Sequence, residues 1–201
     1  MYKIAIDAGH GSKTAGKRTP KLPDGTVIRE HIANVGVAQL VEYKLSKLGF
    51  ETLRVGWNDA ISEDDADIGL SARQKLIKKE KCDIVVSIHF NAHGNGNDFT
   101  SAEGVGLFIH STNKGDSAEL AKVILKYLAQ GTKQKNRGVK AEAFAMVNCK
   151  TMGVKAAVLA ELAFMTNLKE AQLMREYNFW EECATEIVKG VCEYTGVPYK
   201  K

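Results

Sequence analysis

The chain has 201 residues, of which 44% are hydrophobic and 26% charged, with only three prolines. This composition predicts one compact globular domain with a sizeable core and argues against a second full domain. The net charge of +4 is spread along the chain without the clustered Lys and Arg of a nucleic-acid binder, so it allows at most a weak attraction to anionic polymers. No apolar stretch approaches the roughly 18 residues of a membrane span, so we expect no membrane insertion.

The N-terminus and the cysteines indicate where the chain is made. The first residues reach Asp7 without an apolar signal core or a cleavage site of small residues, so we expect no Sec signal peptide. The four cysteines show neither C-x-x-C spacing nor the density of a disulfide scaffold. We therefore expect buried thiols, as in a protein that folds in a reducing cytoplasm. These cysteines are Cys82, Cys149, Cys183 and Cys192.

The first half of the chain alternates predicted strands and helices. Short apolar runs that end at glycine or polar residues predict buried strands, and apolar residues at helical spacing predict helices. Gly49 is well placed to end the first helix as its C′ residue. The predicted elements are a strand over 2–8, a polar loop over 12–29 with a turn at 24–25, a helix over 32–48, a strand over 50–55, an acidic loop over 58–67, a helix over 70–77 and a strand over 83–88.

The second half continues the alternation. Asp116 or Ser117 is the predicted N-cap of its first helix, and Asn167 with Glu170 resembles a capping box. The predicted elements are a Gly/Asn-rich loop over 93–98, a strand over 104–109, helices over 117–130, from 168 and over 180–191, and a strand over 156–160. Such alternation predicts a single α/β domain over residues 1–195, with a mostly parallel twisted β-sheet and helices on both faces. Residues 196–201 are interpreted as a C-terminal tail or linker remnant.

Residues able to bind a metal or move protons follow three of the predicted strands. His10, His89 and Glu161 come directly after strands, and Glu30 stands just before the first helix. Because sites in open parallel sheets lie outside the carboxyl ends of the strands, we expect these four side chains to converge at one edge.

Two imidazoles and one carboxylate are a recurring ligand set for catalytic zinc, which keeps a fourth position for water. His10, Glu30 and His89 provide that set, and Glu161 is the candidate proton carrier. Glu161 interrupts an apolar run over residues 156–164, and a carboxylate there needs a partner or a function. From spacing alone, ordinary structural histidines and a helix-start acid remain an alternative, because separations of 20 and 59 residues are not a compact ligand motif.

Four segments resemble, in order, the signature segments of zinc-dependent N-acetylmuramoyl-L-alanine amidases of the type 3 family. They are IAIDAGHG over residues 4–11, Glu30 ahead of a helix, SIHFNA over 87–92 and VLAELAFMTN over 158–167. The resemblance covers roughly residues 3–195. It implies an α/β catalytic domain that cuts the amide between the lactyl group of N-acetylmuramic acid and L-alanine in bacterial peptidoglycan.

By position, the resemblance implies that His10, Glu30 and His89 bind one Zn²⁺ per chain and that Glu161 is the catalytic carboxylate. Arg73 lies in a segment that also resembles the family, and we interpret it as structural. His31, one residue or about 100° of helix from Glu30, is expected not to be a ligand. The roles of Asn91 and His93 stay open between substrate contact and loop structure.

Two other functions remain open at this point: a zinc peptidase that cuts within the stem peptide, and a non-catalytic wall-binding module with a structural metal. The expected partner is peptidoglycan, with anionic wall polymers as a further possibility, no nucleic acid and no obligate protein partner. The sequence resembles a phage endolysin or a lytic amidase, made in a bacterial cytoplasm and acting at the cell wall after release.

Overall fold

The computed structural model describes residues 2–58, 63–112 and 115–200. Part of the predicted acidic loop, residues 59–62, lies outside the described residues, as do Met1 and Lys201 of the predicted domain and tail. The elements in chain order are β1 (Lys3–Ala8), α1 (Glu30–Lys47), β2 (Glu51–Val55), α2 (Leu70–Lys79), β3 (Ile84–Asn91), β4 (Val105–Ile109), α3 (Asp116–Gly131), β5 (Asn136–Ala141), the 3₁₀ helix η1 (Ala145–Val147), α4 (Cys149–Met152), β6 (Ala156–Phe164), α5 (Leu168–Leu173) and α6 (Tyr177–Thr195).

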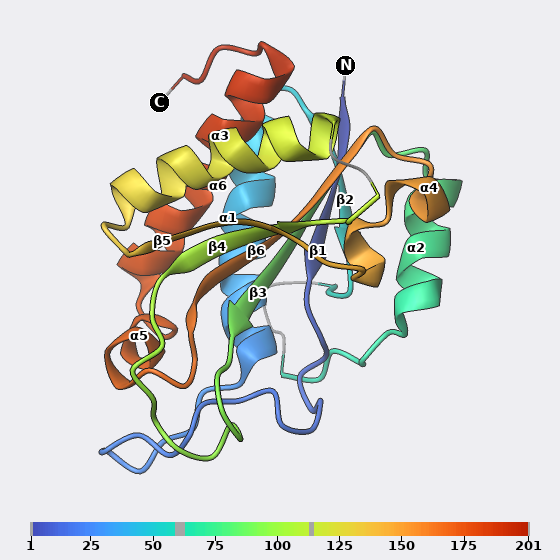
Figure 1. Ribbon diagram of the computed structural model, residues 1–201. Coiled ribbons are helices and arrows are strands. Elements are labelled where there is room, and N and C mark those ends of the chain that lie inside the picture. The colour runs from blue at the N-terminus through green and yellow to red at the C-terminus, as the bar shows by residue number, and fades with distance from the viewer. Residues whose placement is uncertain (1, 59–62, 113–114, 201) are drawn as a thin grey trace.

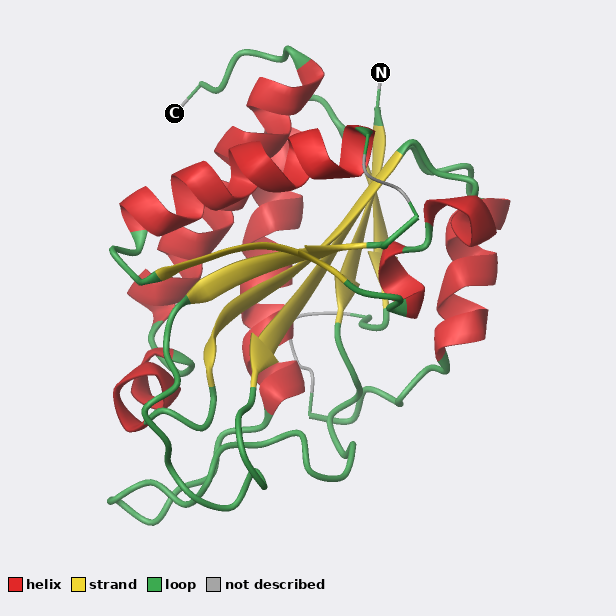
Figure 2. Ribbon diagram, in the orientation of Figure 1, coloured by secondary structure: helices red, strands yellow, loops and turns green. Residues whose placement is uncertain are grey.

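The six strands form one twisted sheet in the order β2-β1-β3-β6-β4-β5 (Figures 1 and 2). Strands β2, β1, β3 and β6 are mutually parallel, whereas β4 pairs antiparallel with β6 and parallel with β5. The prediction of a mostly parallel sheet is therefore confirmed. The carboxyl ends of β1, β3 and β6 meet at the same edge, where loops gather at the bottom of Figure 1.

Helices cover both faces of the sheet, as predicted. Helices α1, α3 and α6 pack on one face and enclose the larger apolar core, while α2, η1 and α4 cover the other face over a smaller one (Figure 1). The central strands β3 and β6 are buried on both faces, which explains why their sequences are continuous apolar runs. All four cysteines are buried and free, as expected. Within the described residues, none of the helices combines the length and apolarity needed to span a membrane.

Several element boundaries differ from the predictions. Strands β3 and β6 extend further than expected, so His89 and Glu161 lie inside strands rather than after them. Glu30 is the first residue of α1 rather than the residue before the helix. Strand β5 and the short η1–α4 segment were not predicted; β5 gave no signal because it is an exposed edge strand without apolar alternation.

The predicted helix caps are partly right. Gly49 follows the C-cap Leu48 of α1 with φ 88°, as predicted for a C′ glycine. The N-cap of α3 is Gly115, and the hydroxyl of Ser117 instead accepts the N–H of Ala157 at 3.0 Å. Asn167 does cap α5 by accepting the N–H groups of residues 169 and 170.

Two glycines allow close packing between the helices that cover the larger core. A Cβ at Gly36 of α1 would lie 2.6 Å from the ring of Trp180, and one at Gly190 of α6 would lie 2.6 Å from the Cα of Ile124 in α3. Because the second neighbour is backbone, it cannot move aside without shifting a helix. The contact of α6 with α3 therefore depends on a residue without a side chain.

We predict that Gly190→Ala destabilises the protein by about 1–3 kcal/mol, because overpacking outweighs the roughly 1 kcal/mol that alanine gains in helix propensity. The free energy of unfolding, measured by denaturant titration, checks this. Gly69→Ser is the control, since nothing lies within 4 Å of a Cβ there and serine is a favoured residue at this N-cap of α2, so it should not lower stability by more than about 0.5 kcal/mol. Equal stability of the Gly190→Ala variant and the parent would contradict the packing argument.

Candidate metal centre

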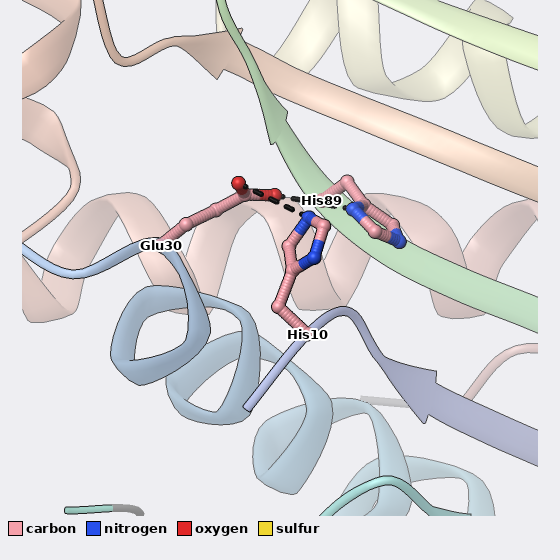
Figure 3. Close-up of side chains that lie close together, drawn as sticks. All are labelled: His10, Glu30 and His89. Carbon is pink, nitrogen blue, oxygen red and sulfur yellow. Dashed lines mark hydrogen bonds and ion pairs between the residues drawn. The ribbon is translucent and has the colours of Figure 1, made fainter. Parts of the chain in front are cut away.

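His10, Glu30 and His89 converge at the carboxyl edge of the sheet (Figure 3). One ligand atom from each lies within 4.8 Å of the others. Nε2 of His10 is 3.3 Å from Oε2 of Glu30, and Nδ1 of His89 is 3.1 Å from Oε1. The two imidazole rings meet edge to face, with their centroids 4.9 Å apart. The structure thus brings together the three residues that the sequence singled out as a ligand set.

Glu30 is the buried centre of this cluster, with only 1% of its surface exposed. Burial raises the pKa of its carboxyl, but the hydrogen bonds and charges of His10 and His89 outweigh this effect and hold the pKa well below its ordinary value. Oε1 also accepts the N–H of Phe90 at 3.2 Å. An ionised carboxylate at this depth requires cations around it.

The donor set fits a divalent cation. Oε2 of Glu30 is buried, and within the described residues its polar contact is the one with Nε2 of His10 at 3.3 Å, which lacks good hydrogen-bond geometry. Two imidazole nitrogens face the same carboxylate, and nitrogen and oxygen donors of this kind suit Zn²⁺. A cation bound among them would compensate the orphaned oxygen. His10 and His89 remain partly exposed, with side-chain exposures of 19% and 14%, so the centre is open on one side.

The backbone around Gly9 sets the positions of both histidines. Gly9 donates its N–H to the carbonyl of Ile88 at 3.0 Å, which joins the end of β1 to β3. A Cβ at this glycine would overlap the ring of His89, so only glycine allows the approach. The next residue, His10, has φ 65°, a left-handed conformation that turns its side chain toward Glu30.

Arg73 of α2 is structural, as the sequence analysis interpreted it. Its buried guanidinium pairs with Asp7 at 2.8 Å and donates to the carbonyls of Ala8 and His10. These bonds fix the chain segment that carries the first histidine. A Cβ at Gly56 would collide with this guanidinium, so this glycine gives it room.

His31 lies next to Glu30 in the chain but faces away from the cluster. Its Nδ1 contacts the carbonyl of Gly9 at 2.7 Å, and its Nε2 contacts Asp65 at 3.0 Å. Both ring nitrogens are therefore engaged, and His31 is fully buried. It supports the loop of Gly9 and is not one of the three clustered residues, in agreement with its expected role.

Glu161 of β6 lies beside the cluster, because it pairs in register with His89 of β3. Neighbouring residues in register point to the same face of a parallel sheet, so both side chains share one side of the sheet. Burial raises the pKa of Glu161 to about 8; the charge of His89 and that of Lys17 oppose the rise, and Glu30 adds to it. Its Oε2 is buried without a hydrogen bond to the described residues.

A cleft of about 320 Å³ opens beside the two histidines. Its walls come from the end of β1, from the start of α2 with the residues before it, and from Met146 of η1. Ile68 and Leu70 on its rim are 40% and 54% exposed. The centre therefore borders a surface where an extended ligand has access to His10 and His89.

The residues left open by the sequence analysis hold the neighbouring loop. Asn91 accepts the N–H of Ala92 at 2.8 Å through its side chain, and its carbonyl accepts the N–H of Met165. His93 is exposed, and its backbone N–H donates to Thr166 at 2.9 Å. The hydrogen bonds of Asn91 and His93 therefore stabilise the loop.

One buried carboxylate near the site has a different role from the one that the sequence predicts. Glu170 does not complete a capping box: its Oε1 accepts the N–H of Gly104 at 2.8 Å, and its Oε2 accepts the N–H of Phe164 at 2.7 Å. It thereby ties the start of β4 to the end of β6. The sequence signal for it was an acid three residues after an N-cap, which is equally typical of a local cap.

Comparison with known proteins agrees with this fold and cluster. The family model of N-acetylmuramoyl-L-alanine amidases, Amidase_3, matches residues 4–193. The N-acetylmuramoyl-L-alanine amidase LytC of Bacillus subtilis (strain 168) is 29% identical over 192 residues, which cover 95% of this chain and 35% of LytC. The chain thus spans about a third of the length of that relative.

Two solved structures are similar over nearly their whole length. An N-acetylmuramoyl-L-alanine amidase from Clostridium difficile 630 superposes with a TM-score of 0.82 at 27% identity, covering 97% of each chain. The catalytic domain of the amidase CwlV from Bacillus (Paenibacillus) polymyxa var. colistinus gives 0.80 at 28% identity, covering 98% of this chain and 100% of CwlV's domain. Since the family model matches almost all of its residues, the chain belongs to the Amidase_3 family of N-acetylmuramoyl-L-alanine amidases.

Proposed function

We propose that the chain cuts the amide between the lactyl group of N-acetylmuramic acid and L-alanine in peptidoglycan, with one Zn²⁺ held by His10, Glu30 and His89. Residues 1–195 form the catalytic domain in this proposal, and residues 196–201 a tail or linker. The observation that carries it is the buried Glu30 carboxylate between two imidazoles, with Glu161 on the neighbouring strand. Membership of an amidase family supports the choice of bond.

Zn²⁺ supplies Lewis-acid chemistry when bound: it lowers the pKa of water toward roughly 7 and polarises a carbonyl. Glu161 is the proton carrier. It accepts the proton of the attacking water and passes it to the L-alanine nitrogen as the amide breaks. Burial raises the pKa of this carboxyl above its ordinary value in the metal-free protein, and such a shift favours a group that holds a proton between the two steps.

The surrounding residues keep this arrangement in place. Arg73 donates to the carbonyls on either side of Gly9, and His31 contacts the carbonyl of Gly9 itself, so that His10 faces Glu30. The hydrogen bond from Phe90 N–H orients the Glu30 carboxylate. Pre-organisation of this kind reduces the reorganisation needed during the reaction.

We also propose that the protein is made in a bacterial cytoplasm and acts at the cell wall after release. A Bacillus anthracis relative named as a cell wall amidase and an endolysin of Bacillus phage SPP1 support this setting. A net charge of +4 favours contact with anionic wall polymers.

The test of the proposed bond is mass spectrometry of digested, purified walls. We expect released stem peptides that begin with a free L-alanine amine, with intact glycan strands, and no release in the presence of a chelator. New termini within the stem peptide would instead establish a peptidase. Binding to walls without any new terminus would establish a wall-binding module.

Replacing Glu161 by Gln should lower kcat by at least about 100-fold, because general acid–base catalysis of this kind contributes about 10²–10⁴. Zinc content, measured by atomic absorption, should stay near one per chain, since Glu161 is not in the ligand set. Glu142→Gln, an exposed acid, serves as the control and should retain full activity. Near-parental turnover by the Glu161→Gln variant would reject the assigned role.

His10→Ala and His89→Ala should each lose bound zinc together with activity, because each removes one of three ligands. The protein is dialysed against metal-free buffer, and its zinc content and circular dichroism are then recorded. His110→Ala is the matched control, as this imidazole contacts Thr112 instead of the cluster. Retention of stoichiometric zinc by both variants would contradict the assignment of His10 and His89 as zinc ligands.

The zinc-free protein should lose stability as the pH rises from about 5 to 8. Burial raises the pKa of Glu161 from 4.5 to about 8, so the folded chain binds more protons than the unfolded chain over this interval. Glu161→Gln removes this cost, and its free energy of unfolding relative to the parent should therefore increase with pH. Denaturant titrations at several pH values check this. A difference independent of pH would contradict the burial argument.

A further inference from the structure

Arg137 of the edge strand β5 has no role in the site described above. Its guanidinium lies over the ring of Phe164, 4.8 Å from the centroid, and its Nη1 donates to the carbonyl of Glu103 at 3.1 Å. Phe164 is the last residue of β6 and pairs with Asn91, so the guanidinium lies at the carboxyl edge where His89 and Glu161 are found.

The side chain of Arg137 shares a face of the sheet with Glu161. Gly106 of β4 pairs in register with Glu161, and paired residues point to the same face. A Cβ built on Gly106 would be 3.4 Å from the Cβ of Arg137, which places the arginine stem on that face. His89, Glu161, Gly106 and Arg137 therefore form one row across the sheet, with no side chain at its third position.

The platform beneath the guanidinium is rigid. Phe164 is only 3% exposed, and its N–H is held by Glu170. Glu170 also binds the N–H of Gly104, next to the carbonyl that receives the arginine bond. Both contacts of Arg137 are thus fixed by one buried carboxylate, so the guanidinium loses little freedom when it binds a ligand.

The remaining face of the guanidinium has no acidic partner. Across the described part of the chain, Arg137 forms no ion pair, and no hydrogen bond engages its Nε or Nη2. The planar fork of an arginine matches the two oxygens of a carboxylate, and the paired bonds are charge-assisted. A carboxylate that arrives along the row from Glu161 would meet these donors.

We infer that Arg137 is a specificity-determining residue that binds the free carboxylate of the second stem-peptide residue, an inference that rests on the proposed function. Strand β5 lies two strand spacings, about 9.6 Å, from β6, and the arginine side chain leans back toward β6. Two extended residues beyond the cut amide span about 7 Å, which brings the second carboxylate within reach of the guanidinium.

The test compares two ligands that differ in one group: N-acetylmuramoyl-L-alanyl-D-isoglutamate and its α-carboxamide, the isoglutamine form. Dissociation constants are measured by calorimetry with the Glu161→Gln variant, which should not cut either ligand. We expect the dissociation constant of the carboxylate form to be at least about tenfold lower than that of the carboxamide form. This difference corresponds to one charge-assisted pair of hydrogen bonds. Arg137→Met in the same background should bring the ratio of the two constants close to one.

Two further variants control for folding and charge. Arg137→Lys keeps the charge but not the fork, and should retain a reduced preference for the carboxylate. Lys140→Met removes another cation from the same strand and should leave the ratio unchanged. Circular dichroism confirms that each variant is folded.

Equal affinity of the two ligands for the parent background, or a preference that survives Arg137→Met, would overturn the inference. The proposed function is judged separately, by whether the unmodified protein cuts the lactyl–L-alanine amide of either ligand. If both ligands are cut and both bind with equal affinity, the proposed amidase function stands and the proposed role of Arg137 does not. Failure to cut either ligand would overturn the proposed function, whereas the binding ratio would still decide the role of Arg137.

Discussion

The pairing of a buried carboxylate with two imidazoles organises the catalytic edge of this protein. Glu30 is almost wholly inaccessible, and an ionised group at that depth is costly unless charged and polar partners surround it. Those partners come from the end of β1 and from β3, which lie side by side because they pair in parallel. The adjacency of two strands more than 70 residues apart thus assembles a cluster whose donor atoms fit a divalent cation.

Contacts outside the cluster maintain its geometry. Gly9 lets the backbone pass against the His89 ring, while Arg73 and His31 bind the carbonyl groups around it. Arg73 and His31 are both buried, and each directs part of its hydrogen-bonding capacity to the backbone of this short segment. The left-handed conformation of His10 is maintained in the same way, because the surrounding hydrogen bonds determine where the chain passes.

Strands β4 and β5, which run antiparallel to the other four strands, border the site on the side of Glu161. Glu161 lies between His89 on β3 and Gly106 on β4, so one face of the sheet carries a histidine of the cluster, a carboxyl and then a position without a side chain. Arg137 borders this open position from the edge strand. Glu170 fixes the ends of β4 and β6 that surround it. The proposed chemistry thus lies on the parallel half of the sheet, and the proposed contact with the substrate peptide lies on the other half.

The fold class, the main helices and the residues of the cluster were predictable from the amino-acid sequence. Central strands buried on both faces must be apolar throughout, and a charged residue next to or within such a run is conspicuous, as His10, His89 and Glu161 are. The ends of β3 and β6, the existence of β5 and the partners of Glu170 and Arg137 are evident only in the folded chain. An exposed edge strand has no apolar pattern, and hydrogen bonds between residues distant in the chain leave no periodic signal, so local sequence could not reveal them.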